Sequence, residues 1–512
     1  PYWGNNGVAW TPDGSGNVYM TGETASTNAI ATTGAQQTVN SLGTRDAFLV
    51  KFNNNGERQW GTYYGGTGAE LGMSVAADSD GNVYIAGNTA SATSISTPGA
   101  HQVAYGGSYD GFLVKFNADG VRQWGTYYGG SSIDFGTSIA IDPPDNIYLV
   151  GETGSASGIA TSGAHQSVLP GPHYNSYLAK FNAYGVRQWG TYYGHTSGAS
   201  QARFVHADMS GNIFMGGTTR ATSGIAPSGA HQTVYGGGPS GSGFGDAFLV
   251  SFNANGVRQW GTYYGGSNQE DGLSATTDGS GNVYLTGYTT SSNAIATTNA
   301  QQTAYGESTD ALLAKFSNTG IRQWGTYCGG SGMEKSWDVR SDGMDNVFIT
   351  GETASLTGIS TAGSHQPVYG GGYKEAYLAQ FSNTGEHLWG SYYGGNGEDY
   401  GKGITIHPPN NLYLVGNTGS NEAISTPGAH QPNRGGYDDA FLVKFELDNI
   451  PTIPEQLLLN NQTFSSGNHN CMGAVQFIEV GNTTIQNGAY LGLTAGSYIS
   501  LLPGTVVQSG AR

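Results

Sequence analysis

The chain of 512 residues is rich in glycine, with 85 residues, and in aromatic residues, at 12%, whereas only 11% of its residues are charged. Its 36 acidic and 19 basic residues give a net charge of −17, which excludes the basic surface that a nucleic acid or an anionic membrane would require. No apolar run approaches the ~20 residues of a membrane span, and no signal peptide is visible at Pro1, which indicates a cytosolic or an already processed chain.

Three phrases recur with a period of about 65 residues, and such a repeat decides the fold prediction. The first ends in Asn-(Val/Ile/Leu)-(Tyr/Phe), the second resembles Asp-Ala-Phe-Leu-Val-Lys-Phe, and the third reads Arg-Gln-Trp-Gly-Thr-Tyr-Tyr-Gly-Gly. Their landmarks are Asn17, Asn82, Asn146, Asn212, Asn282, Asn346 and Asn411 for the first; Asp46, Asp110, Asn175, Asp246, Asp310, Glu375 and Asp439 for the second; and Trp60, Trp124, Trp189, Trp260, Trp324 and Trp389 for the third.

Each period is predicted to contain four strands, as the second complete unit illustrates. Its strands are expected over residues 73–77, 82–87, 111–116 and 122–128, with a long loop between the second and the third. The Asp-Gly pairs between the other strands favour hairpin turns, because these residues tolerate a positive φ. Seven such units predict an all-β, seven-bladed β-propeller of four-stranded antiparallel blades; a solenoid is the alternative, for which a unit of this length is long.

The two ends of the repeat differ from its middle. The chain enters at the first strand of the first blade, because Pro1 aligns just after the Tyr-Tyr-Gly phrase, and it leaves the seventh blade after the third strand, at Phe445. The outer strand of the seventh blade is therefore absent from the pattern. Either a segment upstream of Pro1, or residues 446–459 in an irregular form, or no strand at all is expected at that edge, which would otherwise be open to association.

The repeated Trp-Gly-Thr-Tyr-Tyr-Gly-Gly, Gly-Asn-Val-Tyr and Asp-Ala-Phe-Leu-Val-Lys-Phe phrases resemble those of the SBBP family, a bacterial family named for the seven-bladed beta-propeller. The resemblance covers residues 1–445. It implies a large secreted or surface protein, and it implies no single activity.

The period stops near residue 450, at a Pro-rich linker, so the expected domains are residues 1–449 and 450–512. Beyond the linker, alternating apolar text between Gly488, Gly496 and Gly504 predicts very short strands that turn at these glycines. This tail is similar to the short β-stack modules found near the C-termini of secreted Bacteroidetes proteins, which implies surface delivery by type IX secretion. The two cysteines, Cys328 and Cys471, leave a disulfide open, although Cys328 replaces a repeat tyrosine and is expected to be packed.

In a propeller, the long second-to-third-strand loops and the blade-to-blade loops emerge on one face, where function is expected. The loop phrase Gly-Ala-His-Gln or its variant places His101, His165, His231, His365 and His430, while Gln36 and Gln301 stand in two blades. Because each histidine lies on a different blade and glutamine replaces it without other changes, a hydrogen-bonding loop anchor is favoured over a metal ring. The acid that begins each third strand is likewise expected to cap loop amides, and Asp78-Ser79-Asp80-Gly81 is expected to be a hairpin turn, with calcium as the alternative.

Acids in the blade-to-blade loops predict a ring around the axis. It comprises Glu70, Asp134, Glu270, Asp271, Glu334, Glu398 and Asp399. A solvated acidic rim is the favoured interpretation, and a cation site, with calcium as the ion, or a cationic partner is the alternative.

Departures from the repeat point to ligand binding in blades 3 and 4. The candidates are His173, Tyr174, His195, Arg203, Arg220 and Phe244, together with the insertion 236–245. Arginine, histidine and aromatic side chains together suit a carbohydrate or an anionic ligand, with neutral drift as the alternative. Trp10 and Trp337 also depart from the repeat, in the first strand, and are expected to plug the axis, whereas the repeated tryptophans are expected to pack between sheets.

No metalloprotease, nucleophile-elbow, P-loop or dinucleotide motif is present, so no catalytic residue and no cofactor is assigned. The sequence predicts a secreted or cell-surface propeller that binds or displays, adhesin-like or carbohydrate- or protein-binding. A polysaccharide-active hydrolase or lyase and a structural subunit of a surface assembly are the alternatives. The expected partners are a surface glycan or protein and the surface secretion or assembly machinery, with neither nucleic acid nor direct membrane insertion.

Overall fold

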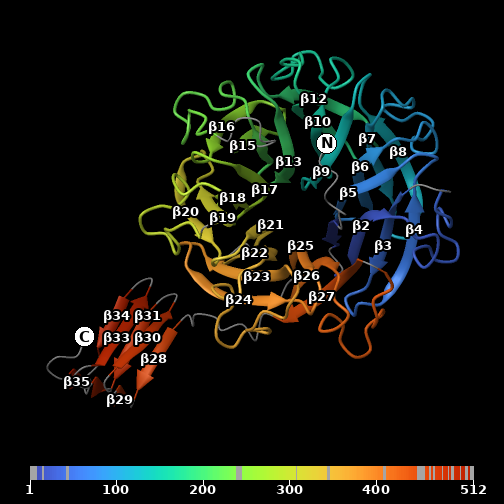
Figure 1. The fold of residues 1–512 in the computed structure, drawn as a ribbon. Helices are drawn as coiled ribbons and strands as arrows, with labels where there is room; N and C mark the ends of the chain where they lie inside the picture. The colour runs from blue at the N-terminus through green and yellow to red at the C-terminus, as the bar shows by residue number, and fades with distance from the viewer. Residues whose placement is uncertain are drawn as a thin grey trace. The chain divides into compact units, whose positions relative to one another are not determined.

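Seven antiparallel β-sheets surround a common axis in the computed structural model of the chain (Figure 1). The structure describes residues 9–446, apart from 14–15, 42–44, 238–244, 307, 343–345, 408–410 and 437, together with the strands between 456 and 507. This part of the chain contains no helix, and hence no helix able to span a membrane. Two compact units are present, Pro1–Phe445 and Glu446–Arg512.

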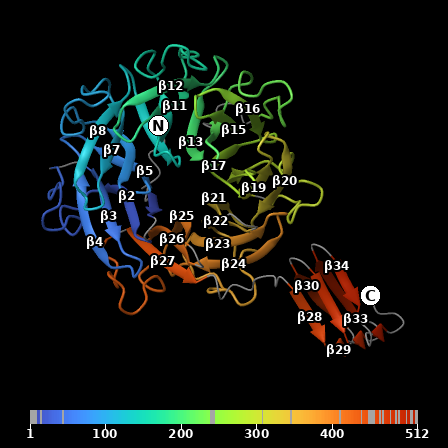
Figure 2. The ribbon, with the colours of Figure 1, turned by 180° about the vertical axis from the view of Figure 1, so that it is seen from behind.

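Six blades have four strands each, in chain order from the axis outward (Figures 1 and 2). Blade 1 is β1 (Ala9–Pro12), β2 (Val18–Thr24), β3 (Asp46–Phe52) and β4 (Arg58–Tyr64); blade 2 is β5 (Glu70–Ala77), β6 (Val83–Thr89), β7 (Asp110–Phe116) and β8 (Arg122–Tyr128); blade 3 is β9 (Asp134–Ile141), β10 (Ile147–Thr153), β11 (Asn175–Phe181) and β12 (Arg187–Tyr193); blade 4 is β13 (Ser200–Ala207), β14 (Asn212–Thr219), β15 (Asp246–Asn253) and β16 (Arg258–Tyr264); blade 5 is β17 (Glu270–Thr277), β18 (Val283–Thr289), β19 (Asp310–Phe316) and β20 (Arg322–Cys328); blade 6 is β21 (Glu334–Ser341), β22 (Asn346–Thr353), β23 (Glu375–Ser382) and β24 (His387–Tyr393).

Blade 7 has three described strands, β25 (Asp399–His407), β26 (Asn411–Thr418) and β27 (Asp439–Glu446). The all-β, seven-bladed fold predicted from the repeat is therefore confirmed. The expectation that residues 446–459 supply the missing outer strand is wrong for 456–459, which belong to β28 (Gln456–Asn460) and pair with β31 (Phe477–Gly481) in the other unit. Residues 447–455 lie outside the described part.

The core of the propeller lies between blades rather than within them. Tyr64 at the end of β4 contacts Phe112 and Phe116 of the next blade, with ring centroids 5.3 and 5.9 Å apart, and its hydroxyl donates to the Ile95 carbonyl at 2.8 Å. The same pattern repeats around the ring, which explains why the Tyr-Tyr phrase recurs. Such aromatic pairs are each worth about 0.5–1.5 kcal/mol beyond the area they bury.

Blade 7 packs directly on blade 1, which closes the ring. Val18 of β2 belongs to one buried cluster with Tyr413 and Val415 of β26. Phe52 of β3 meets His430 edge-on, with ring centroids 5.9 Å apart. The ring is thus closed by side-chain packing between the first and the last blade.

The C-terminal unit is built from short parallel strands. Gln456 pairs with Phe477, which pairs with Tyr498, so the same strand position recurs in successive coils. This parallel stacking makes a small β-solenoid, and the turns predicted at Gly488, Gly496 and Gly504 lie outside the described residues. The remaining strands are β29 (Thr463–Phe464), β30 (Gly467–Ala474), β32 (Thr484–Ile485), β33 (Ala489–Ala495), β34 (Tyr498–Leu501) and β35 (Val506–Val507).

Candidate functional site

Five predicted rim acids are buried inside their own blades. Glu70, Asp134, Glu270, Glu334 and Asp399 each begin an innermost strand and have no exposed surface. Asp134, for example, accepts hydrogen bonds from the Gly130 amide at 2.7 Å, Thr153 Oγ1 at 2.5 Å and Ser155 Oγ at 2.7 Å. The prediction of a solvated rim is therefore wrong for these five, because their side chains turn into the blade and close the preceding loop. No metal-binding group of acids, histidines or cysteines occurs among the described residues.

The acids that begin the third strands cap loop amides, as predicted. Asp110 accepts from the Gly106 amide at 2.9 Å and from Gln102 Nε2 at 3.0 Å, and it is fully buried. Burial raises the pKa of Asp110 to about 6, and the neighbouring Asp134 carboxylate adds to this rise. The pKa values of Asp246, Asp310 and Glu375 are raised to about 7 for the same main reason. At the junction of blades 3 and 4 the neutral side chains of Asn175 and Ser200 replace both acids.

The predicted hairpin turns hold their acids in internal hydrogen bonds. Asp78 accepts from the Asn82 amide at 2.8 Å, from Asn82 Nδ2 and from the Tyr84 hydroxyl at 3.0 Å, and it lies 3.5 Å from Lys115 Nζ. All of these partners of the Asp78 carboxylate belong to the same blade. The turn is therefore structural, as expected.

The loop histidines pack between neighbouring blades. His231 lies against Tyr264 and, edge-on, against Phe316 of the next blade, with centroids 6.4 and 5.9 Å apart. His101, His165, His365 and His430 make the equivalent ring contacts. Gln36 instead accepts a hydrogen bond from the Arg122 amide of the next blade, at 3.2 Å. The loop-anchor interpretation is therefore confirmed in part, because Gln36 makes the expected hydrogen bond whereas the five histidines pack against aromatic rings.

We expect His231→Gln to change the free energy of unfolding by less than about 1 kcal/mol at pH 8, because glutamine fills this position in two blades. Burial lowers the pKa of His231 from its ordinary value of 6.5 to about 4. Between these two pH values the histidine is therefore protonated in the unfolded chain and neutral in the folded chain. The histidine therefore costs stability as the pH falls from 6.5 towards 4, and the variant should gain on the wild type in that window. Thermal unfolding at pH 8 and pH 5 measures this; an equal difference at both values would contradict it.

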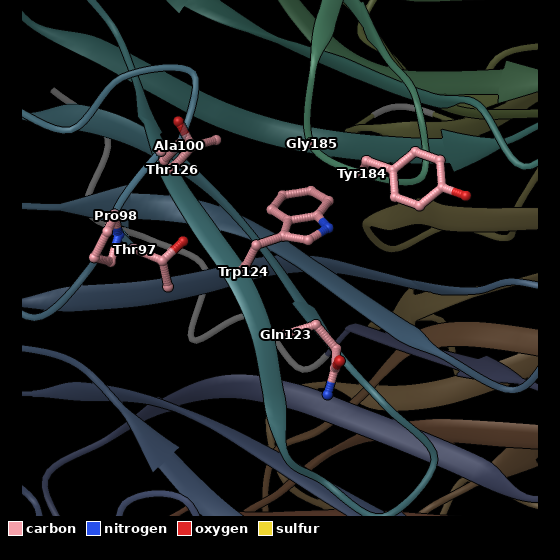
Figure 3. Close-up of a pocket in the computed structure, with 9 residues that line it drawn as sticks. Thr97, Pro98, Ala100, Gln123, Trp124, Thr126, Tyr184 and Gly185 are labelled. Atoms are coloured by element: carbon pink, nitrogen blue, oxygen red, sulfur yellow. The ribbon is translucent and has the colours of Figure 1, made fainter.

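The repeated tryptophans clasp neighbouring blades. Trp124 stacks over Gly185 and donates from Nε1 to the Ala183 carbonyl at 3.1 Å in the next blade. A shallow pocket of about 410 Å³ lies beside this clasp, where Trp124 faces Tyr184 (Figure 3). The packing role predicted for these residues is confirmed by the contacts. A second pocket of about 400 Å³ lies beside His231 and Tyr235.

The candidates in blades 3 and 4 do not form one site. His195 hydrogen-bonds to Ser197 and Ser223 on the surface, whereas Arg203 lies on β13 near the axis. His173, Tyr174 and Arg220 are exposed loop residues. Phe244 and most of the insertion lie outside the described residues. Of the set, only Arg203 belongs to a larger cluster of charged side chains.

That cluster, called the axial cluster below, lies on the two innermost strands of blades 3 to 7, with one member, Lys374, in the loop before β23. Its members are Glu152, Arg203, Asp271, Tyr288, Lys335, Trp337, Glu352, Lys374, Tyr400 and Lys402. Most occupy the second or fourth position of an inner strand, or the position paired with it on the next strand. In blade 2 these inner-strand positions hold Leu71 and Met73, so the polar cluster is a departure from the repeat.

Arg203 organises one half of the axial cluster. Its guanidinium lies 3.2 Å from Glu152 Oε1 and 3.6 Å from Asp271 Oδ2, and the two carboxylate side chains are only 10% and 5% exposed. Gln201 donates to Glu152 Oε2 at 2.7 Å. Burial raises the pKa of Asp271 to about 6, although Arg203 opposes the rise. The arginine predicted as a ligand contact is thus held by two buried carboxylates.

Three lysines converge in the other half. Glu352, whose side chain is 3% exposed, accepts from Lys374 Nζ at 2.8 Å and from Trp337 Nε1 at 3.1 Å. Lys402 Nζ lies 3.8 Å from the centroid of Trp337, and Lys335 Nζ lies 4.4 Å from that of Tyr288. Among the described residues neither ammonium has an ion pair or a hydrogen-bond acceptor.

Burial lowers the pKa of Lys402 to about 8; Glu352 opposes this, while Lys374 and Lys335 add to it. Glu352, and Asp271 towards Lys335, therefore balance only part of the positive charge of the three lysines. Such a site gains from a bound anion. Glu398, from the predicted acid ring, is exposed and accepts a hydrogen bond from the Tyr400 hydroxyl beside this half.

The axial lysines could not be recognised as a group in the sequence, because Lys335 and Lys402 lie on separate strands and Lys374 lies in a loop. One signal could have found them. The other lysines of the chain, Lys51, Lys115, Lys180, Lys315 and Lys444, all occupy the lysine position of the Asp-Ala-Phe-Leu-Val-Lys-Phe phrase. Lys335, Lys374 and Lys402 are the ones outside it, and Lys335 stands two residues before Trp337, which the sequence analysis had singled out. Cys328 is a free thiol packed beside the core of blades 5 and 6, which accords with its packed role.

The SBBP beta-propeller repeat matches residues 59–92 and 123–158, which span the outer strand of one blade and the first two strands of the next in two successive places. A relative, the uncharacterized WD repeat-containing protein L264 of Acanthamoeba polyphaga mimivirus, is 21% identical over 440 residues, covering 74% of this chain and 32% of that protein. The chain thus spans about a third of that relative's length.

Two solved structures are similar at a low level. A gluconolactonase, XC5397 of Xanthomonas campestris, is 9% identical with a TM-score of 0.31, over 69% of this chain and 87% of that one. Prolyl oligopeptidase B of Galerina marginata is 7% identical with a TM-score of 0.29, over 90% of this chain and 58% of that one. Likeness at this level does not extend to activity.

Proposed function

We propose that the chain is a secreted or cell-surface binding propeller whose axial cluster holds an acidic saccharide. The observation that carries the proposal is the pair of ammonium groups, on Lys335 and Lys402, that lie among aromatic rings with no acceptor among the described residues. The secreted or surface location rests on the resemblance of the repeat and of the C-terminal module. A glycan of another surface is the expected partner.

The chemistry of the axial cluster suits a carboxylated or sulfated sugar. Lysine ammonium groups bind anionic oxygens through charge-assisted hydrogen bonds, which are about twice as strong as neutral ones. Aromatic rings offer apolar faces to a ligand, and a few placed charges fix its orientation. Glu352 keeps Lys374 and Trp337 in place through direct hydrogen bonds. An overall acidic protein with a local basic site would select acidic ligands by that site alone.

We expect Lys402→Met and Lys335→Met each to weaken binding of acidic oligosaccharides by about 10- to 100-fold, the usual effect of losing a hydrogen bond to a charged group. Lys444→Met, which removes an exposed lysine from β27, is the matched control and should leave affinity unchanged. Because burial lowers the pKa of Lys402 to about 8, wild-type affinity should fall as the pH rises through 8.

Isothermal titration with uronic-acid and sulfated oligosaccharides, and with their neutral counterparts, measures these effects. Equal binding of neutral and acidic sugars would contradict the proposal, as would affinity within twofold of the wild type in both axial lysine variants. A failure to bind any glycan would favour a structural subunit of a surface assembly.

The lowered pKa of Lys402 favours one second candidate, a polysaccharide lyase. A lysine with a pKa near 8 can act as a general base. In a β-elimination the base would take the proton next to the uronate carboxylate, a carbon–carbon double bond would form, and the bond to the leaving sugar oxygen would break as that oxygen takes a proton from water. Ultraviolet absorbance of the unsaturated product distinguishes this reaction from binding, because a binder releases no such product.

A further inference from the structure

The shallow pocket beside Trp124 contains an aromatic side chain that breaks the repeat. Tyr184 lies in the turn between β11 and β12 and is 83% exposed. Within the described part of the chain, its side chain has neither a hydrogen bond nor a ring partner, so packing within the fold does not account for it. The equivalent turn positions of blades 1, 2, 4, 5 and 6 hold short polar residues, namely Asn55, Asp119, Asn255, Thr319 and Thr384.

The pocket places this tyrosine beside the half-buried ring of Trp124 (Figure 3). The indole has no free donor, because its Nε1 donates to the Ala183 carbonyl at 3.1 Å. Gln123, which is exposed, donates from Nε2 to the Val121 carbonyl at 3.0 Å, and its Oε1 has no partner among the described residues. The side-chain polar atoms open to a ligand are therefore the Tyr184 hydroxyl and Gln123 Oε1.

The charge and size of the pocket restrict what it can hold. The described residues that line it are all uncharged, although the chain as a whole has a net charge of −17. An anion would lack a cation to pair with, and a cation would lack a carboxylate. The volume of about 410 Å³ lies in the range of small-ligand sites. A small neutral ligand therefore fits best.

The main-chain groups on the outer edge of β8 are already paired with the preceding loop. The Thr97 amide donates to the Gly125 carbonyl at 2.9 Å, and the Tyr127 amide donates to the Gln102 carbonyl at 3.2 Å. A peptide added as a strand takes its affinity from such groups, so this edge does not suit one. The pocket offers an aromatic face and two polar side-chain atoms, which suit a ligand that has an apolar face and hydroxyl groups.

We propose that this pocket, called the Tyr184 pocket below, binds a neutral saccharide. One sugar ring stacks on the Tyr184 ring beside Trp124, and its hydroxyl groups hydrogen-bond to the Tyr184 hydroxyl and to Gln123 Oε1. Because β8 is the outermost strand of its blade, the Tyr184 pocket lies at the outer rim of the propeller, away from the inner strands that carry the axial cluster (Figure 1). It is therefore a second site, with a ligand class of its own.

The next blade junction has similar surroundings without the tyrosine. Trp189 donates from Nε1 to the Ala254 carbonyl at 3.1 Å, and the neighbouring Gln188 is exposed. Asn255 stands at the position of Tyr184. A single substitution can therefore remove the tyrosine from one junction or place one at the other.

Saturation-transfer difference NMR on the full chain, with neutral oligosaccharides of glucose, galactose, mannose and N-acetylglucosamine, tests the proposal. We expect at least one of them to bind with a dissociation constant of about 1 mM or lower. Tyr184→Asn should weaken its binding by about 10-fold or more, because the substitution truncates the aromatic anchor. Asn255→Tyr should add a second site beside Trp189. Met209→Asn, the matched control at a turn residue that is 87% exposed, should leave affinity unchanged.

The three substituted positions are exposed turn residues, so all three variants should keep the thermal midpoint of the wild type. No binding of any of these sugars at about 10 mM would overturn the proposal. Affinity within twofold of the wild type in Tyr184→Asn would overturn it too, as would the absence of a second site in Asn255→Tyr. A proline-rich peptide that binds in place of the sugars and is lost in Tyr184→Asn would assign the pocket to a polyproline segment instead.

The outcome is separate from that of the axial cluster. Tyr184→Asn removes the site at the outer rim, so neutral and acidic sugars titrated into this variant report on the axial cluster alone. Loss of acidic sugar binding in the axial lysine variants and loss of neutral sugar binding in Tyr184→Asn are therefore two independent results.

Discussion

Arg203→Met is expected to lower the free energy of unfolding by about 3–5 kcal/mol at pH 8, the usual cost of leaving buried charges unpaired. The guanidinium is the cation within 4 Å of both Glu152 and Asp271, and its removal leaves two carboxylates in low dielectric. Asp271, with a pKa raised to about 6, is neutral at pH 5, so the loss should be smaller there. Denaturant unfolding at both pH values measures the difference.

Two further variants separate charge from packing. Arg220→Met removes an exposed arginine of the same blade and should change stability by less than about 0.5 kcal/mol. Combining Arg203→Met with Glu152→Gln and Asp271→Asn removes the unpaired charges, and should recover most of the loss. No recovery in the combined variant would show that the arginine acts through its packing alone and would contradict the electrostatic account.

Asp310→Asn is expected to stabilise the propeller by about 3 kcal/mol at pH 8 and to have almost no stabilising effect at pH 4. Burial raises the pKa of Asp310 to about 7, and the Glu334 carboxylate adds to the rise. The folded form therefore keeps its proton between pH 4 and 7 while the unfolded chain has lost it. The stability that this group contributes is complete below pH 4 and is lost as the pH rises through 7.

The chain itself provides the precedent for this substitution. Asn175 fills the same position in blade 3, where its Nδ2 donates to the His173 carbonyl at 2.8 Å. Asp119→Asn, at an exposed turn position, is the matched control and should show no pH-dependent difference. Unfolding free energies measured from pH 4 to pH 8 give the profile. A difference between Asp310→Asn and the wild type that stays constant over this range would contradict the raised pKa.

The fold could be predicted from the sequence because its repeat is local and regular. The predicted fourth strand of the second unit, residues 122–128, coincides with β8, since Arg122 follows a turn glycine and the Trp-Gly-Thr-Tyr-Tyr phrase fills the rest. The first strand was predicted from Met73, whereas β5 begins at Glu70. A β-bulge between Gly72 and Ser74 breaks its alternation, and the period-two pattern cannot show such a bulge.

The acidic rim was predicted wrongly for a related reason: the sequence pattern does not fix the exact position at which an inner strand begins. Glu70 and Asp271 look alike in the sequence, because both are acids at the start of an inner strand. Glu70 occupies the first position and turns into the blade towards Thr89, whereas Asp271 occupies the second and reaches Arg203. A single residue of register decides between a buried loop cap and a member of the axial cluster. The members of the axial cluster come from five blades, so no single stretch of the sequence could have predicted it.

The most direct test of the account is a structure of the chain with an acidic oligosaccharide bound. We expect its carboxylate or sulfate within hydrogen-bonding distance of Lys402 Nζ or Lys335 Nζ, with a sugar ring against the aromatic side chains of the axial cluster. A ligand bound instead in the shallow pocket beside Trp124 and Tyr184, or in the pocket beside His231 and Tyr235, would contradict the assignment of the binding site.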